Sequence, residues 1–126
     1  MTVSSESERP GGLLAKHPPS IDELKRRLIP VCRKHGIVGV QLYGSVARGD
    51  AKAGSDVDLI VEVDPSRPSL GFDGYFDLQE DLTKAAGVPV DVMTSEDYQR
   101  IGNPYLLISI SDAKMTLLTR EEIERE

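Results

Sequence analysis

The segment of residues 37–59, IVGVQLYGSVARGDAKAGSDVDL, decides the fold of this chain. Residues 37–43 are mostly apolar and predict a strand, which the pair Gly44-Ser45 ends. Residues 46–48 predict a short helix that opens directly off this turn. After a loop, residues 56–63 alternate and are rich in Val, Leu and Ile, which predicts a second strand. The segment therefore predicts two strands joined through a tight glycine turn and a short helix.

Further helices and strands are predicted on both sides of this segment. They are helices at 20–35, 73–86 and 104–113, a capped helical turn at 94–97, and strands at 88–93 and 115–118. Ser20 and Glu23 have the spacing of a capping box at the first helix, and Gly36 suits its C-terminal cap. Pro30 predicts a bend within that helix. The order of elements indicates an α/β (α+β) fold in which helices pack on a small mixed β-sheet.

The length of 126 residues suits one compact domain. We place this domain at residues 20–119. Residues 1–19 are rich in Ser, Glu, Pro and Gly and are interpreted as a disordered arm. Residues 120–126 alternate in charge and are interpreted as a solvated C-terminal tail.

The net charge of −6, from 21 acidic and 15 basic residues, disfavours direct nucleic-acid binding and an anionic membrane surface. Cys32 is the only cysteine, so the sequence offers neither an intramolecular disulfide nor a cysteine-based zinc site. No apolar run approaches the roughly 20 residues of a membrane span. The N-terminus lacks the apolar core of a signal peptide, and we expect a cytoplasmic protein.

Asp56 and Asp58 are the first candidates for chemistry. Residues i and i+2 of a strand project from the same face, so the two carboxylates should lie a few ångströms apart. Like charges at that distance repel each other, and a bound divalent cation relieves the repulsion. The alternative is a pair of exposed aspartates on an edge strand.

Two other features support a site at this place. Gly44 and Ser45 join a strand to a helix start, where free backbone amides and the Ser45 hydroxyl favour a phosphate. Asp91 interrupts an otherwise apolar strand, where a charge is costly unless it is paired or coordinates a cation. An ordinary turn and a solvent-facing edge aspartate are the alternatives. Together the features predict a phosphate-binding turn beside three carboxylates.

The string Gly44-Ser45-Val46-Ala47-Arg48-Gly49, followed after six residues by Asp56-Val57-Asp58-Leu59, resembles the signature of the DNA polymerase beta-like nucleotidyltransferases. The longer pattern is similar to that of the minimal nucleotidyltransferase (MNT) family. The resemblance covers residues 20–118 and implies the polymerase beta-like fold.

The resemblance also implies a role for each matching residue. Asp56, Asp58 and Asp91 match the metal ligands and catalytic carboxylates, and Gly44 and Ser45 match the triphosphate-binding turn. Arg48 is a candidate phosphate contact. Relatives often carry Arg where this chain has Val46. The cofactors implied are two Mg²⁺ ions, or Mn²⁺, with ATP as the nucleotide donor.

The same resemblance implies transfer of a nucleoside monophosphate to a hydroxyl group. MNT proteins are similar to the antitoxin of two-gene modules, whose partners are HEPN-family ribonuclease toxins. The single short domain favours a partner protein as the acceptor, and the resemblance implies that this partner is a HEPN protein. The alternatives are an antitoxin that acts by binding alone and an enzyme for a small molecule such as an aminoglycoside. His17 and His35 are expected away from the site, and Tyr43 and Tyr75 in the core, with Tyr43 bordering the turn.

Overall fold

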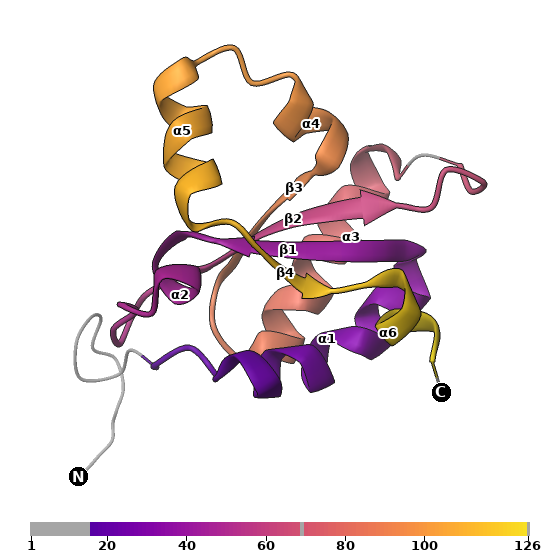
Figure 1. Cartoon of the computed structure of the whole chain (residues 1–126). Coiled ribbons are helices and arrows are strands. Elements are labelled where there is room, and N and C mark those ends of the chain that lie inside the picture. Colours follow the sequence, from indigo (N-terminus) through magenta and orange to yellow (C-terminus); the bar gives the residue numbers. More distant parts are fainter. Residues whose placement is uncertain (1–15, 69, 126) are drawn as a thin grey trace, which may run out of the picture.

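A four-stranded mixed sheet with helices on both faces forms the protein (Figure 1). The computed structural model describes residues 16–68 and 70–125. The elements are α1 (Ile21–His35), β1 (Ile37–Tyr43), α2 (Gly44–Arg48), β2 (Val57–Val63), α3 (Gly71–Ala86), β3 (Val90–Thr94), α4 (Ser95–Gln99), α5 (Pro104–Ala113), β4 (Met115–Leu118) and α6 (Arg120–Glu124). This architecture confirms the predicted fold class.

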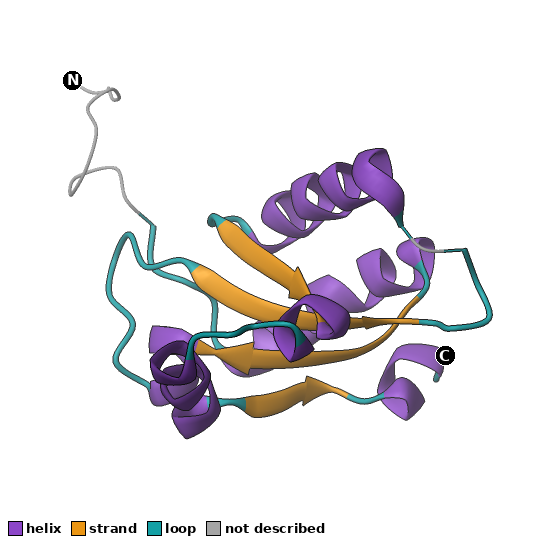
Figure 2. Cartoon of the chain, turned by 90° about the horizontal axis from the view of Figure 1, so that it is seen from above, coloured by secondary structure: helices purple, strands orange, loops and turns teal. Residues whose placement is uncertain are grey.

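The strands lie in the order β3-β2-β1-β4, and Figure 2 shows them side by side from above. β1 pairs antiparallel with both β2 and β4, whereas β2 pairs parallel with β3. The parallel connection is made through α3, as parallel strands require a crossover. The two central strands of the sheet are β1 and β2, and the glycine turn and α2 connect them.

The two faces of the sheet are covered differently. Alternate residues such as Leu42, Leu59 and Val92 are buried on the face covered by α1, α3 and α6, where the main apolar core lies (Figure 1). The opposite face lies under α4 and α5, and there Ile60 and Ile110 are only 3% exposed. We call this second surface the upper face.

Helix α1 follows the predicted capping signals closely. The Ser20 hydroxyl accepts a hydrogen bond from the Glu23 amide at 3.2 Å, and Gly36 ends the helix with φ +70°. The Glu23 carboxylate does not complete the box and instead pairs with Arg26 and Arg27. Leu24, Leu28 and Cys32 face the core from one stripe of the helix, and the helix continues through Pro30 to His35.

The C-terminal segment differs from the expected solvated tail. Residues 120–124 form α6, which begins with a capping box between Thr119 and Glu122 and buries Ile123 to 2% exposure. Arg33 donates hydrogen bonds to the carbonyls of Ile123 and Arg125, and so fixes α6 against α1. A single apolar residue within a charged run gave too weak a periodicity to predict this packing.

Part of the expected N-terminal arm is also ordered. Residues 1–15 lie outside the described residues, but Pro18 is buried and the Lys16 carbonyl accepts a hydrogen bond from the Gly54 amide at 2.9 Å. A ring nitrogen of His17 lies 3.2 Å from the Ala51 carbonyl. These contacts attach the chain before α1 to the loop that leads to Asp56.

Among the described helices, none combines the length and the apolar character needed to cross a membrane.

Candidate functional site

Three polar side chains form a row across the upper face, at one end of the sheet. Tyr43 of β1 pairs in register with Asp58 of β2, which pairs in register with Asp91 of β3. Residues paired across neighbouring strands point to the same face, about 5 Å apart. Asp56 lies one residue before β2 and is exposed. The structure therefore places Asp58 and Asp91 side by side, with Asp56 at the start of the same strand.

Gly44 lies directly against Asp58. A methyl group built on Gly44 would lie 2.2 Å from Oδ2 of Asp58, and its φ of +79° is a value that side chains rarely adopt. No side chain caps the start of α2 at Tyr43. Glycine is thus required here for two reasons, the positive φ and the close approach of the backbone to the carboxylate.

Burial and like charge both act on Asp58. Burial first, and then the neighbouring charges of Asp91 and Asp56, raise the pKa of Asp58 to about 6, while Arg48 acts in the opposite direction. Burial and the charges of Asp58 and Asp91 also raise the pKa of Tyr43 to about 12. Such a site favours a cation between the carboxylates, because a cation offsets both the repulsion and the lost hydration.

The donor atoms of the site suit a hard divalent cation. Carboxylate oxygens are the ligands that Mg²⁺ and Mn²⁺ prefer, and burial together with the charges of Asp91 and Asp56 raises the pKa of Asp58. In residues 16–68 and 70–125, however, no group of three or more His, Cys, Asp or Glu side chains is ready to hold a metal ion. Convergence of Asp56, Asp58 and Asp91 on metal therefore stays a prediction.

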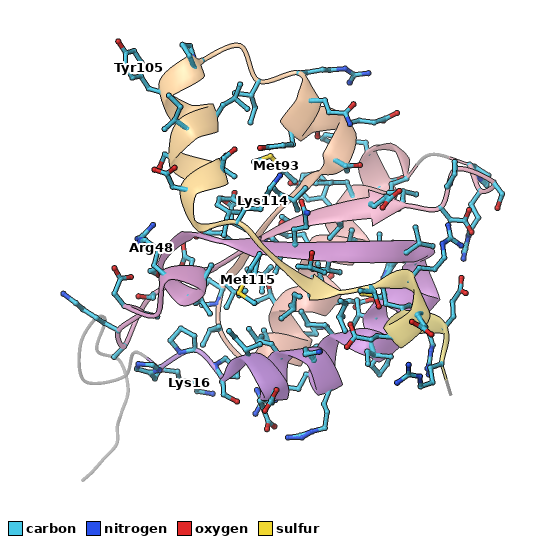
Figure 3. All side chains as sticks on the ribbon, in the orientation of Figure 1. Lys16, Arg48, Met93, Tyr105, Lys114 and Met115 are labelled. Atoms are coloured by element: carbon cyan, nitrogen blue, oxygen red, sulfur yellow. The ribbon has the colours of Figure 1, made fainter. Side chains whose placement is uncertain are left out.

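The remaining candidate residues lie on α2. Ser45 is half-buried in its first turn, and Arg48 is exposed at its end, with Nε 3.3 Å from Oδ2 of Asp50. Figure 3 shows Arg48 projecting outward at α2, whereas Met93 and Lys114 lie in the space between α4 and α5. In this conformation the positive charge of Arg48 lowers the pKa of Asp58 by a Coulomb interaction over a distance.

Comparison with known protein families identifies the family of this chain. The sequence model of the nucleotidyltransferase domain matches residues 24–125, which include every element from the first turns of α1 to α6. The chain belongs to this family. The predicted enzyme class is therefore confirmed, and the protein is a nucleotidyltransferase.

Known proteins of the same kind resemble the nucleotidyltransferase in sequence and fold. A Methanocaldococcus jannaschii protein named as a putative protein adenylyltransferase is 36% identical over 75 residues, covering 60% of this chain and 77% of the relative. The structure of a minimal nucleotidyltransferase is 28% identical with a TM-score of 0.55, covering 77% of this chain and 95% of that one. These matches confirm the resemblance to the minimal nucleotidyltransferases.

A solved complex extends the similarity at the level of the fold. It contains a tri-AMPylated Shewanella oneidensis HEPN toxin with an MNT antitoxin, and the matched chain is 17% identical with a TM-score of 0.53. The match covers 79% of this chain and 72% of that one. At this identity the similarity shows the shared fold alone.

Two residues of α3 in the nucleotidyltransferase hold Asp91 in place and were not recognised from the sequence. The Tyr75 hydroxyl donates to the Val92 carbonyl at 2.5 Å, and the Gln79 amide donates to the Val90 carbonyl. These two carbonyls flank Asp91 on the outer edge of β3, which is an edge strand of the four-stranded sheet. The signal in the sequence was the i, i+4 spacing of two polar-tipped side chains beside an apolar stripe.

We predict that the metal-free nucleotidyltransferase loses stability as the pH rises from about 4 to about 6. The pKa of Asp58 is higher in the folded state than its ordinary value of 3.8, so the folded state binds the proton more tightly. The stabilisation is complete below the unfolded pKa and is lost as the pH rises through the folded one. After allowance for solvent screening we expect about 1–2 kcal/mol.

Urea unfolding in EDTA between pH 4 and pH 8 measures this effect. Asp58→Asn should remove the loss, so that its advantage over the wild type grows with pH. Asp112→Asn changes an exposed carboxylate on α5 and is the control. An equal pH dependence in the wild type and Asp58→Asn would contradict the prediction.

Proposed function

We propose that this nucleotidyltransferase is a metal-dependent protein adenylyltransferase that transfers AMP from ATP to a hydroxyl group of a HEPN-family protein, and that it acts as the antitoxin of that toxin in the cytoplasm. The observation that carries the proposal is the row of Asp58 and Asp91 beside Gly44. The name of the Methanocaldococcus jannaschii relative and the AMPylated toxin in the solved complex support AMP as the transferred group and a HEPN protein as the acceptor.

The order of strands places the expected triphosphate site and the expected acceptor site on opposite sides of Asp58. Gly44 and Ser45 follow β1 on one side of Asp58, and Asp91 lies on β3 on the other side. Backbone amides at the start of α2 would bind the triphosphate, because a helix start favours anions. The acceptor hydroxyl would then approach from the side of Asp91.

The reaction exchanges one phosphorus–oxygen bond for another. The acceptor oxygen attacks the α-phosphorus of ATP and forms a new phosphorus–oxygen bond. The bond between the α-phosphorus and the oxygen that bridges it to the β-phosphate breaks, and this oxygen leaves with the electron pair as part of pyrophosphate. The proton of the acceptor hydroxyl passes to Asp91 or to solvent. Asp56, Asp58 and Asp91 would hold the cations, which stabilise charge on the attacking and leaving oxygens. The protein otherwise supplies position and fixed charge.

A transfer assay tests the proposal. The chain is incubated with Mg²⁺, ATP labelled at the α-phosphate, and a purified HEPN-family protein as the acceptor. We expect the label on the HEPN protein, stable to denaturation, and release of one pyrophosphate per AMP. ATP labelled at the γ-phosphate should leave the acceptor unlabelled. No transfer by the folded enzyme would contradict the proposal.

An assay of the ribonuclease activity of the HEPN protein separates catalysis from inhibition by binding alone. The double variant Asp56→Ala with Asp58→Ala removes two of the three carboxylates. If this variant neutralised the ribonuclease as fully as the wild type, contact alone would be sufficient. We expect instead that it neutralises the ribonuclease only in proportion to its binding, with no lasting effect after dilution.

A further inference from the structure

A groove of about 600 Å³ lies where the ends of β2 and β3 meet the first turns of α3 and α4. Among the described residues that line it, Leu70, Phe72 and Tyr75 contribute apolar surface. Phe72 is 78% exposed and packs edge-to-face on Phe76, with the ring centroids 4.8 Å apart. An exposed phenylalanine beside a groove of this size indicates a surface that binds another molecule.

The groove lies at the C-terminal ends of β2 and β3, further along the strands than the row of Asp58 and Asp91, and Tyr75 connects the row to the groove. Tyr75 lines it, and the hydroxyl of Tyr75 bonds to the carbonyl of Val92, the residue after Asp91. Burial, and then the negative charges of Asp91 and Asp97, raise the pKa of Tyr75, so its hydroxyl group senses a carboxylate of the row and a carboxylate of the groove. The groove is thus on the Asp91 side of Asp58, opposite the Gly44-Ser45 turn.

The charge of the groove is predominantly negative. Its described lining carries the carboxylates of Asp64, Glu96 and Asp97 and the guanidinium of Arg67. Arg100 lies 3.9 Å from Asp97 but is not part of the lining. Negative charge beside apolar surface complements a segment that carries basic residues around an aromatic or aliphatic side chain.

We propose that this groove binds the acceptor protein, by a segment in which basic residues flank the side chain that receives AMP or a neighbouring apolar anchor. The inference rests on the proposed function, because it assigns the acceptor side of the same site. In-line displacement requires the attacking and leaving oxygens on opposite sides of the α-phosphorus. With the triphosphate at Gly44 and Ser45, the acceptor arrives across Asp91, along the groove.

A titration with a small probe tests the groove without any transfer reaction. The probe is the capped tripeptide Arg-Tyr-Arg, with capped Glu-Tyr-Glu as its control, followed by amide chemical shifts of the labelled full chain. We expect the basic peptide to shift residues 64–67, 70–75 and 94–97, and the acidic peptide to leave them in place. Shifts confined to another surface, or none at millimolar peptide, would overturn the proposal.

Variants with matched controls test the same groove with the protein acceptor. Glu96→Lys should raise the KM for the HEPN protein about tenfold and leave the KM for ATP unchanged. Glu80→Lys makes the same charge reversal on an exposed position of α3 outside the groove. Phe72→Ser should also raise this KM, whereas Ile108→Ser removes an exposed apolar side chain of α5 and should not.

The docking groove and the transferase function are contradicted by different results. Equal KM values for the wild type, Glu96→Lys and Phe72→Ser would overturn the groove and leave the transferase function in place. A larger effect of Ile108→Ser would instead assign docking to α5, where Tyr105 points away from the sheet (Figure 3). Absence of label with the wild type would contradict the proposed function, and the peptide titration would still decide the groove.

Discussion

Asp58→Asn is expected to lower AMP transfer by at least about a thousandfold while the protein remains folded. Asp58 is the central member of the row, with Tyr43 on one side and Asp91 on the other. Asparagine keeps the shape of the side chain and removes the negative charge that a cation needs. Because the repulsion from Asp91 and Asp56 also disappears, the variant should be at least as stable as the wild type at neutral pH.

Glu62→Gln is the matched control for this variant. Glu62 is an exposed carboxylate on the same face of the same strand, four residues beyond Asp58. Its neutralisation should change transfer less than about twofold. Initial rates with labelled ATP and unfolding curves for both variants measure the outcome. A variant Asp58→Asn that kept more than a tenth of the wild-type rate would show that Asp58 is not a metal ligand.

Gly44→Ala is expected to lower the rate of AMP transfer about a hundredfold or more, although it should lower the stability of the protein only slightly. The added methyl group would lie 2.2 Å from Oδ2 and 3.2 Å from Cγ of Asp58. The carboxylate is the end of a short side chain and can move away at little cost. Its displacement removes it from the place where it would meet the cation, and errors of about 1 Å have large effects on rate.

Gly49→Ala separates backbone strain from this displacement. Gly49 ends α2 with φ +84°, close to the φ of Gly44, but a methyl group there would meet nothing within 4 Å. Both variants should therefore lose about 1 kcal/mol of stability from the positive φ. Only Gly44→Ala should show the large loss of rate. Similar rates for the two variants would mean that strain, and not the contact with Asp58, limits the reaction.

The local chemistry of the chain was readable from the sequence because it depends on neighbouring residues. The cap at Ser20, the left-handed cap at Gly36, the turn at Gly44 and the alternation of residues 56–63 all act over a few residues. The pairing of Gly44-Ser45 with Asp56-Val57-Asp58 carried the family resemblance for the same reason. These features were sufficient to predict the mixed sheet, the enzyme class and the candidate carboxylates.

Strand order and register were decided only by the tertiary structure. Asp91 is 33 residues from Asp58 in the sequence, and a register shifted by one residue would turn it to the opposite face. The hydrogen bonds of Tyr75 and Gln79 to the edge of β3, the contact of His17 with Ala51 and the burial of Ile123 likewise join distant segments. Sequence alone therefore identified which side chains are candidates for the chemistry. Packing of the sheet and its helices determined which of them meet, because such contacts depend on the relative positions of elements that local periodicity does not encode.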